Sequence, residues 1–273
     1  MDLDDPDTVA AYDELPLWSA LAGQLLLEHV PLAPGMRVLD VGCGTGFPLL
    51  ELAQRLGSRS KVVGIDPWSA ALDRARFKAR VRGIANVDIT EGDASSLPFP
   101  DGGFDLIVSN LGINNFENPE RVLRECRRVA RPEGRLVLTT NLRGHMSELY
   151  EIFDATLSAL GDEEARRALS AHVAHRTTVE GLRALFESAG FRLARTVERR
   201  ASMRFADGSA LFRHYFIRLG FLDGWKGVVP EDRREAVFAR LEEDLNRAAK
   251  DRGSLDLTIP LAYAEATRID SAP

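Results

Sequence analysis

Short apolar segments alternate with amphipathic stretches along the first half of the chain, and the two patterns predict different elements. Five segments are apolar or β-branched with little polar alternation and predict buried strands: 37–41, 61–66, 86–90, 104–109 and 135–140. Apolar residues recur at helical spacing in the stretches between and before them: 16–29, 48–56, 70–82 and 119–129. Strands that are apolar on both faces and alternate with helices are typical of a parallel sheet covered by helices on both sides.

The pattern changes after the fifth predicted strand. Three helices are predicted there, at residues 146–160, 163–175 and 179–189, and Gly190 closes the last of them. A sixth strand is predicted at 191–197, a long insert at about 198–253, and a final strand near 255–268.

These elements predict an α/β fold with a doubly wound, mostly parallel sheet of seven strands. We expect a single domain over residues 1–273, in which 1–141 form a nucleotide-binding core. A helical cap, inserted after strands five and six, would comprise 142–190 and 198–253. Residues 254–273 would form the final strand and a tail. Ligands of such sheets bind outside the carboxyl ends of the strands.

Two apolar stripes mark helices inside the long insert. The first consists of Leu211, Phe212, Tyr215, Phe216 and Leu219, on a helix that begins at Asp207 or Ser209 and ends at Gly220. The second consists of Val237, Leu241 and Leu245. Core packing explains most such stripes. The alternative is that Phe212, Phe216, Phe221 and Trp225 form the apolar wall of a substrate pocket.

Composition narrows the class of protein. Of 273 residues, 45% are hydrophobic and 28% charged, which is typical of a globular chain, and the formal net charge is −6. That charge disfavours binding to nucleic acid or to an anionic membrane. Cys43 and Cys126 are far apart, so neither a disulfide framework nor a metal site is expected. The acidic N-terminus lacks signal-peptide features, and no apolar run reaches membrane-spanning length. We therefore expect a cytoplasmic protein.

The strongest motif is VLDVGCGTG at residues 38–46, where an apolar strand enters a glycine-rich turn before a helix. Such a turn lets the backbone approach a ligand closely. In a dinucleotide site of the form G-x-G-x-x-G the third glycine would stand at Phe47. Asp40, just before the turn, would repel pyrophosphate and attract an ammonium group. Electrostatics therefore favours S-adenosylmethionine (SAM), which carries an ammonium and a sulfonium, over NAD.

Two further carboxylates follow the next two strands. Asp66 ends the second strand, where it can accept hydrogen bonds from ribose hydroxyls, or alternatively cap the next helix. Pro67 and Trp68 come next and could pack against adenine. Asp93 follows the third strand and could accept a hydrogen bond from the adenine amino group, or be an ordinary turn residue.

With these motifs the chain resembles the class I SAM-dependent methyltransferases, in particular the group that includes the ubiquinone/menaquinone C-methyltransferase. The resemblance covers about residues 12–141 and rests on VLDVGCGTG, VVGIDPW, GDASSLPFPDGGFDLIVSN and RECRRVARPEGRLVLTT. It departs from the family at RPEG, residues 131–134, where many relatives have a proline and two glycines. We expect this segment to lie in a turn.

The resemblance implies SAM as cofactor, S-adenosylhomocysteine (SAH) as product, and a role for each motif residue. The methionine part of SAM would be held by Asp40 and by the turn that contains Gly42, Cys43, Gly44 and Gly46. Asp66 would bind the ribose, and Asp93 with the backbone of Ala94 would bind adenine. Asn110 and Leu111, after the fourth strand, would lie beside the transferred methyl.

Candidate acceptor residues follow the fourth and fifth strands. They are Asn114, Asn115, Asn141, Arg143 and His145. We expect His145 to contact the acceptor as a base or hydrogen-bond partner, although a surface or helix-capping histidine would look the same. His172, His175 and His214 are weaker candidates, because each lies in a predicted helix. A base is required only if the acceptor is protonated and poorly acidic, since methyl transfer is an in-line displacement that depends mainly on positioning.

The sequence therefore predicts a SAM-dependent methyltransferase that acts on a small molecule. A nucleic-acid or protein methyltransferase, or a non-catalytic SAM-binding protein, is the alternative. Against a nucleic-acid enzyme, the segment SNLG at residues 109–112 lacks the prolines of the motif that clasps a flipped base. A hydride-transfer enzyme is disfavoured by Asp40 and Phe47. The acceptor, the methylated atom and the oligomeric state stay open, a homodimer included.

Overall fold

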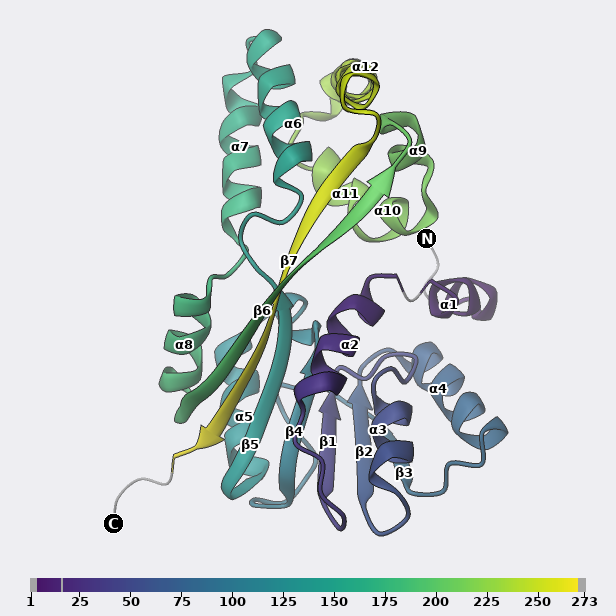
Figure 1. Ribbon diagram of the computed structural model, residues 1–273, viewed down its shortest axis with the longest axis vertical. Helices are drawn as coiled ribbons and strands as arrows, with labels where there is room; N and C mark the ends of the chain where they lie inside the picture. Colours follow the sequence, from purple (N-terminus) through teal and green to yellow (C-terminus); the bar gives the residue numbers. More distant parts are fainter. Residues whose placement is uncertain (1–3, 16, 270–273) are drawn as a thin grey trace. The chain divides into compact units, whose positions relative to one another are not determined.

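A computed structural model describes residues 4–15 and 17–269 (Figure 1). The chain divides into two compact units. Unit 1 comprises Met1–Asn141, Thr178–Arg199 and Leu261–Pro273; unit 2 comprises Leu142–Thr177 and Arg200–Pro260. Each unit is described by itself.

One sheet of seven strands has the order β3-β2-β1-β4-β5-β7-β6. The strands are β1 (Arg37–Val41), β2 (Lys61–Asp66), β3 (Val87–Glu91), β4 (Phe104–Asn110), β5 (Ala130–Asn141), β6 (Phe191–Phe205) and β7 (Leu255–Arg268). Strands β1 to β5 pair in parallel, and β7 runs antiparallel to β5. The predicted doubly wound, mostly parallel sheet is confirmed. The unit boundary falls within the two long strands β6 and β7.

Helices cover the sheet of unit 1. They are α1 (Pro6–Asp13), α2 (Ser19–His29), α3 (Leu49–Leu56), α4 (Ser69–Val81), α5 (Pro119–Val129) and α8 (Val179–Ser188), with a 3-10 turn η1 at Gly112–Asn114. Figure 1 shows α2 and α3 in front of the strands and α5 behind them. Helix α5 shows how the sequence sets where a helix begins. The Asn118 side chain caps it by accepting from the Arg121 N–H, and Pro119 is its first residue. Its buried face is apolar.

Unit 2 is mainly helical. Its elements are α6 (Ser147–Ala159), α7 (Glu163–Ala174), α9 (Gly208–Arg213), α10 (Tyr215–Gly220), α11 (Leu222–Lys226), η2 (Glu231–Arg233) and α12 (Arg234–Arg252). Helix α12 contacts both α6 and α9. The predicted stripe on α12, Val237, Leu241 and Leu245, is buried, as core packing requires.

Several predicted boundaries need correction. The predicted helix at 16–29 is described from Ser19, and Pro16 lies outside the described residues. The single helix expected up to Gly220 is two helices, because His214 has an extended backbone; Asp207 caps the first. Strand β6 continues to Phe205, beyond the predicted end at residue 197. It is the last strand in the sheet order, where polar residues such as those at 198–204 can face solvent.

The RPEG segment, expected in a turn, lies inside β5. Between the pairs Phe104–Ala130 and Leu106–Arg135 the register shifts, so β5 has extra residues opposite β4. Glu133 takes a left-handed backbone with φ of 59° to absorb them. The segment is therefore an irregular section of a strand. Helices α1 and α11 were not predicted, because each is short and lacks a clear apolar stripe.

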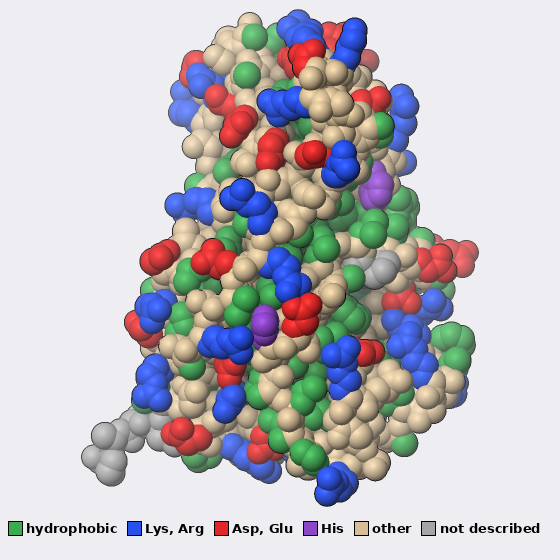
Figure 2. All heavy atoms as spheres, in the orientation of Figure 1, with side chains coloured by type: hydrophobic (Ala, Val, Ile, Leu, Met, Phe, Trp, Pro, Cys, Tyr) green, Lys and Arg blue, Asp and Glu red, His purple; other side chains and the backbone are tan. Residues whose placement is uncertain are grey.

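Charged residues of both signs are interspersed over the face shown in Figure 2. In the chain as a whole, 41 acidic residues outnumber 35 lysines and arginines. Within the described ranges, 4–15 and 17–269, no helix combines the length and apolarity needed to cross a lipid bilayer.

Candidate cofactor and acceptor sites

The carboxyl ends of four parallel strands, β3, β2, β1 and β4, lie next to one another at one edge of the sheet. Asp40 pairs in register with Gly64 of β2 and Val108 of β4, and Asp66 pairs with Glu91 of β3. Asp93 follows β3 by two residues. The three predicted carboxylates therefore occur at the same edge on neighbouring strands, as a ligand site of a doubly wound sheet requires.

The glycine turn after β1 is held against β2. The backbone amides of Gly42 and Cys43 both donate to the Ile65 carbonyl, at 2.8 and 3.2 Å. Gly46 has a φ of 97°, and a Cβ atom there would lie 3.1 Å from Ala75 and 3.2 Å from Leu50. A side chain at this position would strain the backbone and crowd α3 and α4, so the turn favours glycine strongly.

Asp40 is a fully buried carboxyl group in β1. Among the described residues neither of its oxygens has a hydrogen-bond partner. Burial, reinforced by the charge of Asp66, raises the pKa of Asp40 to about 8. A cation beside Asp40 would favour its ionised form, whereas an anion would be repelled. This part of the turn fits the ammonium end of a ligand such as SAM and does not fit pyrophosphate.

Asp66 connects the glycine turn to the start of α4. Its Oδ2 accepts from the Gly44 N–H at 2.9 Å and its Oδ1 accepts from the Trp68 N–H at 2.9 Å. Burial raises the pKa of Asp66, although these two donors act in the opposite direction. Each carboxylate oxygen keeps acceptor capacity for a further donor, such as a ribose hydroxyl. Pro67, next to it, is exposed.

Tyr12 lies against Trp68, a contact that the sequence patterns did not predict. Its ring meets the Trp68 indole edge-to-face, with 5.3 Å between centroids. Burial, followed by the charges of Asp66 and Asp13, raises the pKa of Tyr12. Tyr12 thus stands with Trp68 near Asp66. The only sequence signal was the Asp5–Pro6 start of a short helix, which places Tyr12 in its last turn.

Asp93 is exposed and forms a local turn with Ser95. Its Oδ1 accepts from the Ser95 N–H at 2.8 Å and its Oδ2 from the Ser95 hydroxyl at 2.6 Å. These hydrogen bonds lower the pKa of Asp93. The observed contacts are those of a turn residue, and a role toward adenine stays a prediction. Ala94, beside it, is buried.

The side chain of Asn110 is engaged within the protein. Its Nδ2 donates to the Ser19 carbonyl of α2 at 3.0 Å, and its Oδ1 accepts from the Thr139 hydroxyl at 2.7 Å. Leu111 has a left-handed backbone with φ of 63°, and its N–H donates to both the carbonyl and the hydroxyl oxygen of Thr139. Thr139 therefore fixes the strained turn after β4, a role that the sequence did not reveal.

The close fit between α2 and the glycine turn depends on Gly23. A Cβ atom at Gly23 would lie 2.2 Å from the Phe47 ring and 3.2 Å from Asn110 Nδ2. The Phe47 ring therefore occupies the space that a side chain on α2 would need. Similarly, a Cβ at Gly64 would lie 2.8 Å from the Cys43 sulfur. Cys43 is buried, and burial raises the pKa of its thiol, so its contribution is packing of a neutral side chain.

Two of the predicted acceptor residues in unit 1 are hydrogen-bonded to each other. Asn114 donates from its Nδ2 to Asn141 Oδ1 at 2.7 Å and accepts from the Thr140 hydroxyl at 2.6 Å. Asn141 is fully buried at the end of β5. Asn115 is exposed, with its N–H bonded to the Gly112 carbonyl. The structure brings Asn114 and Asn141 together but leaves Asn115 on the surface.

His145 and Arg143 belong to unit 2. His145 is buried, with its ring centroid 5.6 Å from that of Phe221. Burial, followed by the charges of Arg176, His175 and His172, lowers the pKa of His145 to about 3. The imidazole is therefore neutral at physiological pH and a weak base. Arg143 is exposed, and its guanidinium donates to the Ala174 carbonyl at 3.5 Å.

The aromatic residues predicted for a pocket wall form a cluster in unit 2. The ring centroids of Phe212 and Trp225 are 6.4 Å apart, and Trp225 stacks on Phe221 at 5.8 Å. Phe216 meets Phe221 edge-to-face. The Trp225 Nε1–H donates to the Tyr150 hydroxyl at 3.1 Å. Trp225 and Phe216 are buried, so they serve the core of this unit; a contact with a ligand stays a prediction.

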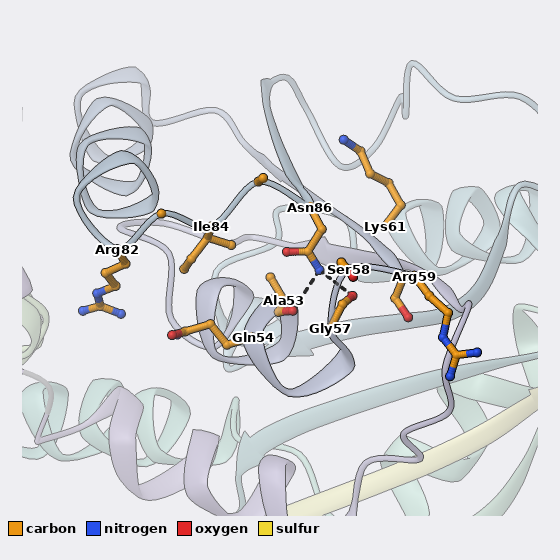
Figure 3. A pocket seen from close by; sticks show the side chains of 12 residues that line it. Ala53, Gln54, Gly57, Ser58, Arg59, Lys61, Arg82, Ile84 and Asn86 are labelled. Carbon is orange, nitrogen blue, oxygen red and sulfur yellow. Dashed lines mark hydrogen bonds between the residues drawn. The ribbon is translucent and has the colours of Figure 1, made fainter.

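A separate open pocket of about 550 Å³ lies at the amino ends of β2 and β3, whereas the three carboxylates lie at the carboxyl ends of the strands (Figure 3). It is lined by the last turn of α3, the end of α4 and the residues that precede β2 and β3. Asn86, one of the lining residues, donates to the carbonyls of Ala53 and Gly57, at 2.8 and 3.0 Å. The glycine turn and the three carboxylates do not line this pocket.

Comparisons with known proteins agree with this geometry. A family model described as a methyltransferase domain matches residues 32–190. Nocamycin O-methyltransferase from Saccharothrix syringae is 31% identical over 247 residues, covering 87% of this chain and 87% of that protein. Demethylmenaquinone methyltransferase from Thermus thermophilus is 37% identical over 183 residues, covering 64% of this chain and 80% of that protein.

Among solved structures, a SAM-dependent methyltransferase from Aquifex aeolicus superposes with a TM-score of 0.52 at 25% identity, covering 71% of this chain and 92% of that one. The family match spans more than half of the chain, and it includes β1 to β5 and the glycine turn. A glycine turn beside a buried carboxyl group, with a second carboxylate on the adjacent strand, suits the donor that this family uses. The chain therefore belongs to the class I SAM-dependent methyltransferases, with SAM as its methyl donor and SAH as the product.

Proposed function

We propose that this enzyme methylates an oxygen atom of a small organic molecule. The match to nocamycin O-methyltransferase covers 87% of the chain, so it extends well into unit 2, where we expect acceptor selection. The match to demethylmenaquinone methyltransferase covers a smaller share of the chain, 64%. Similarity over the larger share favours the O-methyltransferase as the guide to the acceptor.

The main support for the proposed cofactor site is the state of Asp40, whose carboxyl group is buried beside the glycine turn and has a raised pKa. In this proposal Asp40 faces the ammonium group, and the turn with Gly42, Gly44 and Gly46 follows the methionine part. Asp66 accepts hydrogen bonds from the ribose hydroxyls. Asp93, the Ala94 backbone, Pro67 and Trp68 surround adenine.

When bound, SAM supplies an electrophilic methyl group on a sulfonium, which an acceptor atom can displace in line. The protein's part is positioning and exclusion of water. The Leu111 turn, fixed by Thr139, and the Asn114–Asn141 pair are the structural elements of unit 1 that we assign to the methyl-transfer end. A phenol or enol acceptor that is already acidic requires no strong base from the protein.

In unit 2 we assign the acceptor to the neighbourhood of His145, with Arg143 and the aromatic residues Phe212, Phe216 and Trp225 as further candidates. Asn115, at the surface of unit 1, stays a candidate as well. A pKa of about 3 suits His145 to hydrogen bonding in its neutral form better than to proton abstraction. Of the two roles expected from the sequence, we therefore favour the hydrogen-bond partner.

Two measurements test the proposal. Calorimetry should show binding of SAM and SAH and no binding of NAD, and the Asp66→Ala variant should bind SAH more weakly. A screen of small phenols, enols and quinones with methyl-labelled SAM should then find label on oxygen. Label on carbon would refute the choice of acceptor atom, and label on RNA, DNA or protein substrates alone would refute the small-molecule function.

A further inference from the structure

Helix α1 ends at Asp13 and lies far from α4 in the sequence but against it in space (Figure 1). The Oδ1 atom of Asp13 accepts from Lys78 Nζ at 2.5 Å and its Oδ2 from Arg74 Nε at 2.9 Å. The exposed fractions of the Asp13 and Lys78 side chains are only 11% and 14%. A carboxylate so well shielded, with a separate cation on each oxygen, is a fixed junction and not a transient surface pair.

The same carboxylate also reaches the glycine turn. Burial alone would raise the pKa of Asp13, but hydrogen bonds from Lys78, Arg74 and the Thr45 hydroxyl outweigh burial and lower the pKa. Thr45 lies between Gly44 and Gly46 and is buried. Ion pairs thus tie one side chain of α1 to the helix that follows β2, and Thr45 of the turn that follows β1 lies near enough to stabilise its charge.

The residue next to Asp13 shows what this junction holds in place. Tyr12 packs against Trp68, whose backbone amide donates to Asp66. Each Asp13 oxygen already accepts from a cation of α4, and we assign Asp13 no contact with the ligand. Its effect on a ligand would therefore pass through the position of Tyr12 and of the turn.

We propose that Asp13 is a positioning residue that latches α1 onto α4 beside the glycine turn, so that Tyr12 closes over the nucleoside part of bound SAM or SAH. The inference rests on the proposed cofactor site. Opening of the latch is the step that releases the nucleoside, and the ion pairs of Asp13 set its rate.

The test compares Asp13→Asn with Asp7→Asn, which makes the same chemical change at an exposed position of the same helix. Stopped-flow displacement should show SAH leaving Asp13→Asn about tenfold faster than it leaves the wild type, the loss expected for ion pairs that are mostly but not wholly buried. Asp7→Asn should release SAH at the wild-type rate. Equal rates in all three proteins would overturn the latch.

A second measurement separates the latch from a general loss of stability. A glutamate-specific protease can cut after the exposed Glu14, directly behind the latch. SAH should slow this cut in the wild type and in Asp7→Asn, but not in Asp13→Asn. In addition, Lys78→Met should accelerate release by itself and add little to Asp13→Asn. Additive effects of the two substitutions would contradict a shared junction.

Failure of the latch and failure of the cofactor site give different results. If the wild type binds SAH and Asp66→Ala weakens it while Asp13→Asn behaves as the wild type, the latch alone is refuted. If Asp66→Ala also binds as the wild type, the cofactor site is placed wrongly, and Asp13 loses its assigned role with it.

Discussion

Replacement of Asp40 by asparagine should stabilise the cofactor-free protein at neutral pH and at the same time weaken its affinity for SAM. The carboxyl group has a pKa of about 8 in the fold, against 3.8 in its unperturbed state. Between these two values the unfolded chain is ionised while the folded chain keeps its proton. Stability therefore falls as pH rises through this window, by about 1.4 kcal/mol per pH unit, and levels off above the folded-state pKa.

An asparagine side chain has nearly the same shape as the aspartic acid that it replaces and does not titrate. Between about pH 5.5 and 7.5 the advantage of Asp40→Asn over the wild type should therefore grow by about 3 kcal/mol, a large share of a typical domain's stability. Urea unfolding at several pH values measures this difference. Asp88→Asn is the control, since Asp88 pairs with Lys61 at the surface with 58% of its side chain exposed. It makes the same chemical change at an exposed position, so it shows what the change from carboxyl to amide does by itself.

The same substitution removes the charge that faces the ammonium group in our proposal. SAH affinity should fall by about 1.5–3 kcal/mol, the range for a hydrogen bond to a charged group. Calorimetry at neutral pH in two buffers of different ionisation enthalpy should show that the wild type releases a proton on binding SAH and that Asp40→Asn does not. Parallel stability curves for the two proteins, or proton release by both, would refute the reasoning.

Three other predictions concern neighbouring residues. Asp66→Ala should lower SAH affinity by about 1–3 kcal/mol, because the two amides of Gly44 and Trp68 and the ribose hydroxyls all lose the carboxylate that accepts from them. Unchanged calorimetric affinity would exclude the ribose role. Thr139→Val should lower the free energy of unfolding by about 1–2 kcal/mol and reduce turnover more than it raises the KM for SAM, and Thr139→Ser should restore both; failure of serine to rescue would show that the hydroxyl is not the cause. The His145 imidazole, with a pKa of about 3, should stay neutral from about pH 5 to pH 8 in NMR titration; a transition near the ordinary value of histidine would contradict its burial.

The sequence predicted the sheet well because its strands are apolar on both faces, a pattern that few structures besides a covered parallel sheet produce. The strand boundaries of Arg37–Val41 and Lys61–Asp66 agree residue for residue. Periodicity failed where the chain departs from a regular repeat: at His214, whose extended backbone splits a helix, and in β6, which continues through polar residues assigned to the insert. Neither departure changes the local hydrophobic pattern enough to be visible.

The candidate site was predictable to the extent that it depends on strand ends. Asp40 and Asp66 follow from a strand, a turn and a second strand. Tyr12 and Thr139 could not be found in this way, because their roles come from contacts with residues distant in the sequence. Likewise, Asn110 was expected beside the ligand, yet its amide is occupied by Ser19 and Thr139. Only the folded chain reveals which hydrogen-bonding groups are already used.

The contact of Gly23 with the Phe47 ring has a consequence for how this enzyme can vary. A methyl group on α2 and the aromatic ring behind the glycine turn cannot share the same space, since they would be 2.2 Å apart. The two positions are distant in the chain but tied to one another in the fold. A lineage that gains a side chain at the first position must shrink or redirect the side chain at the second, so we expect substitutions at these two positions to occur together within the family.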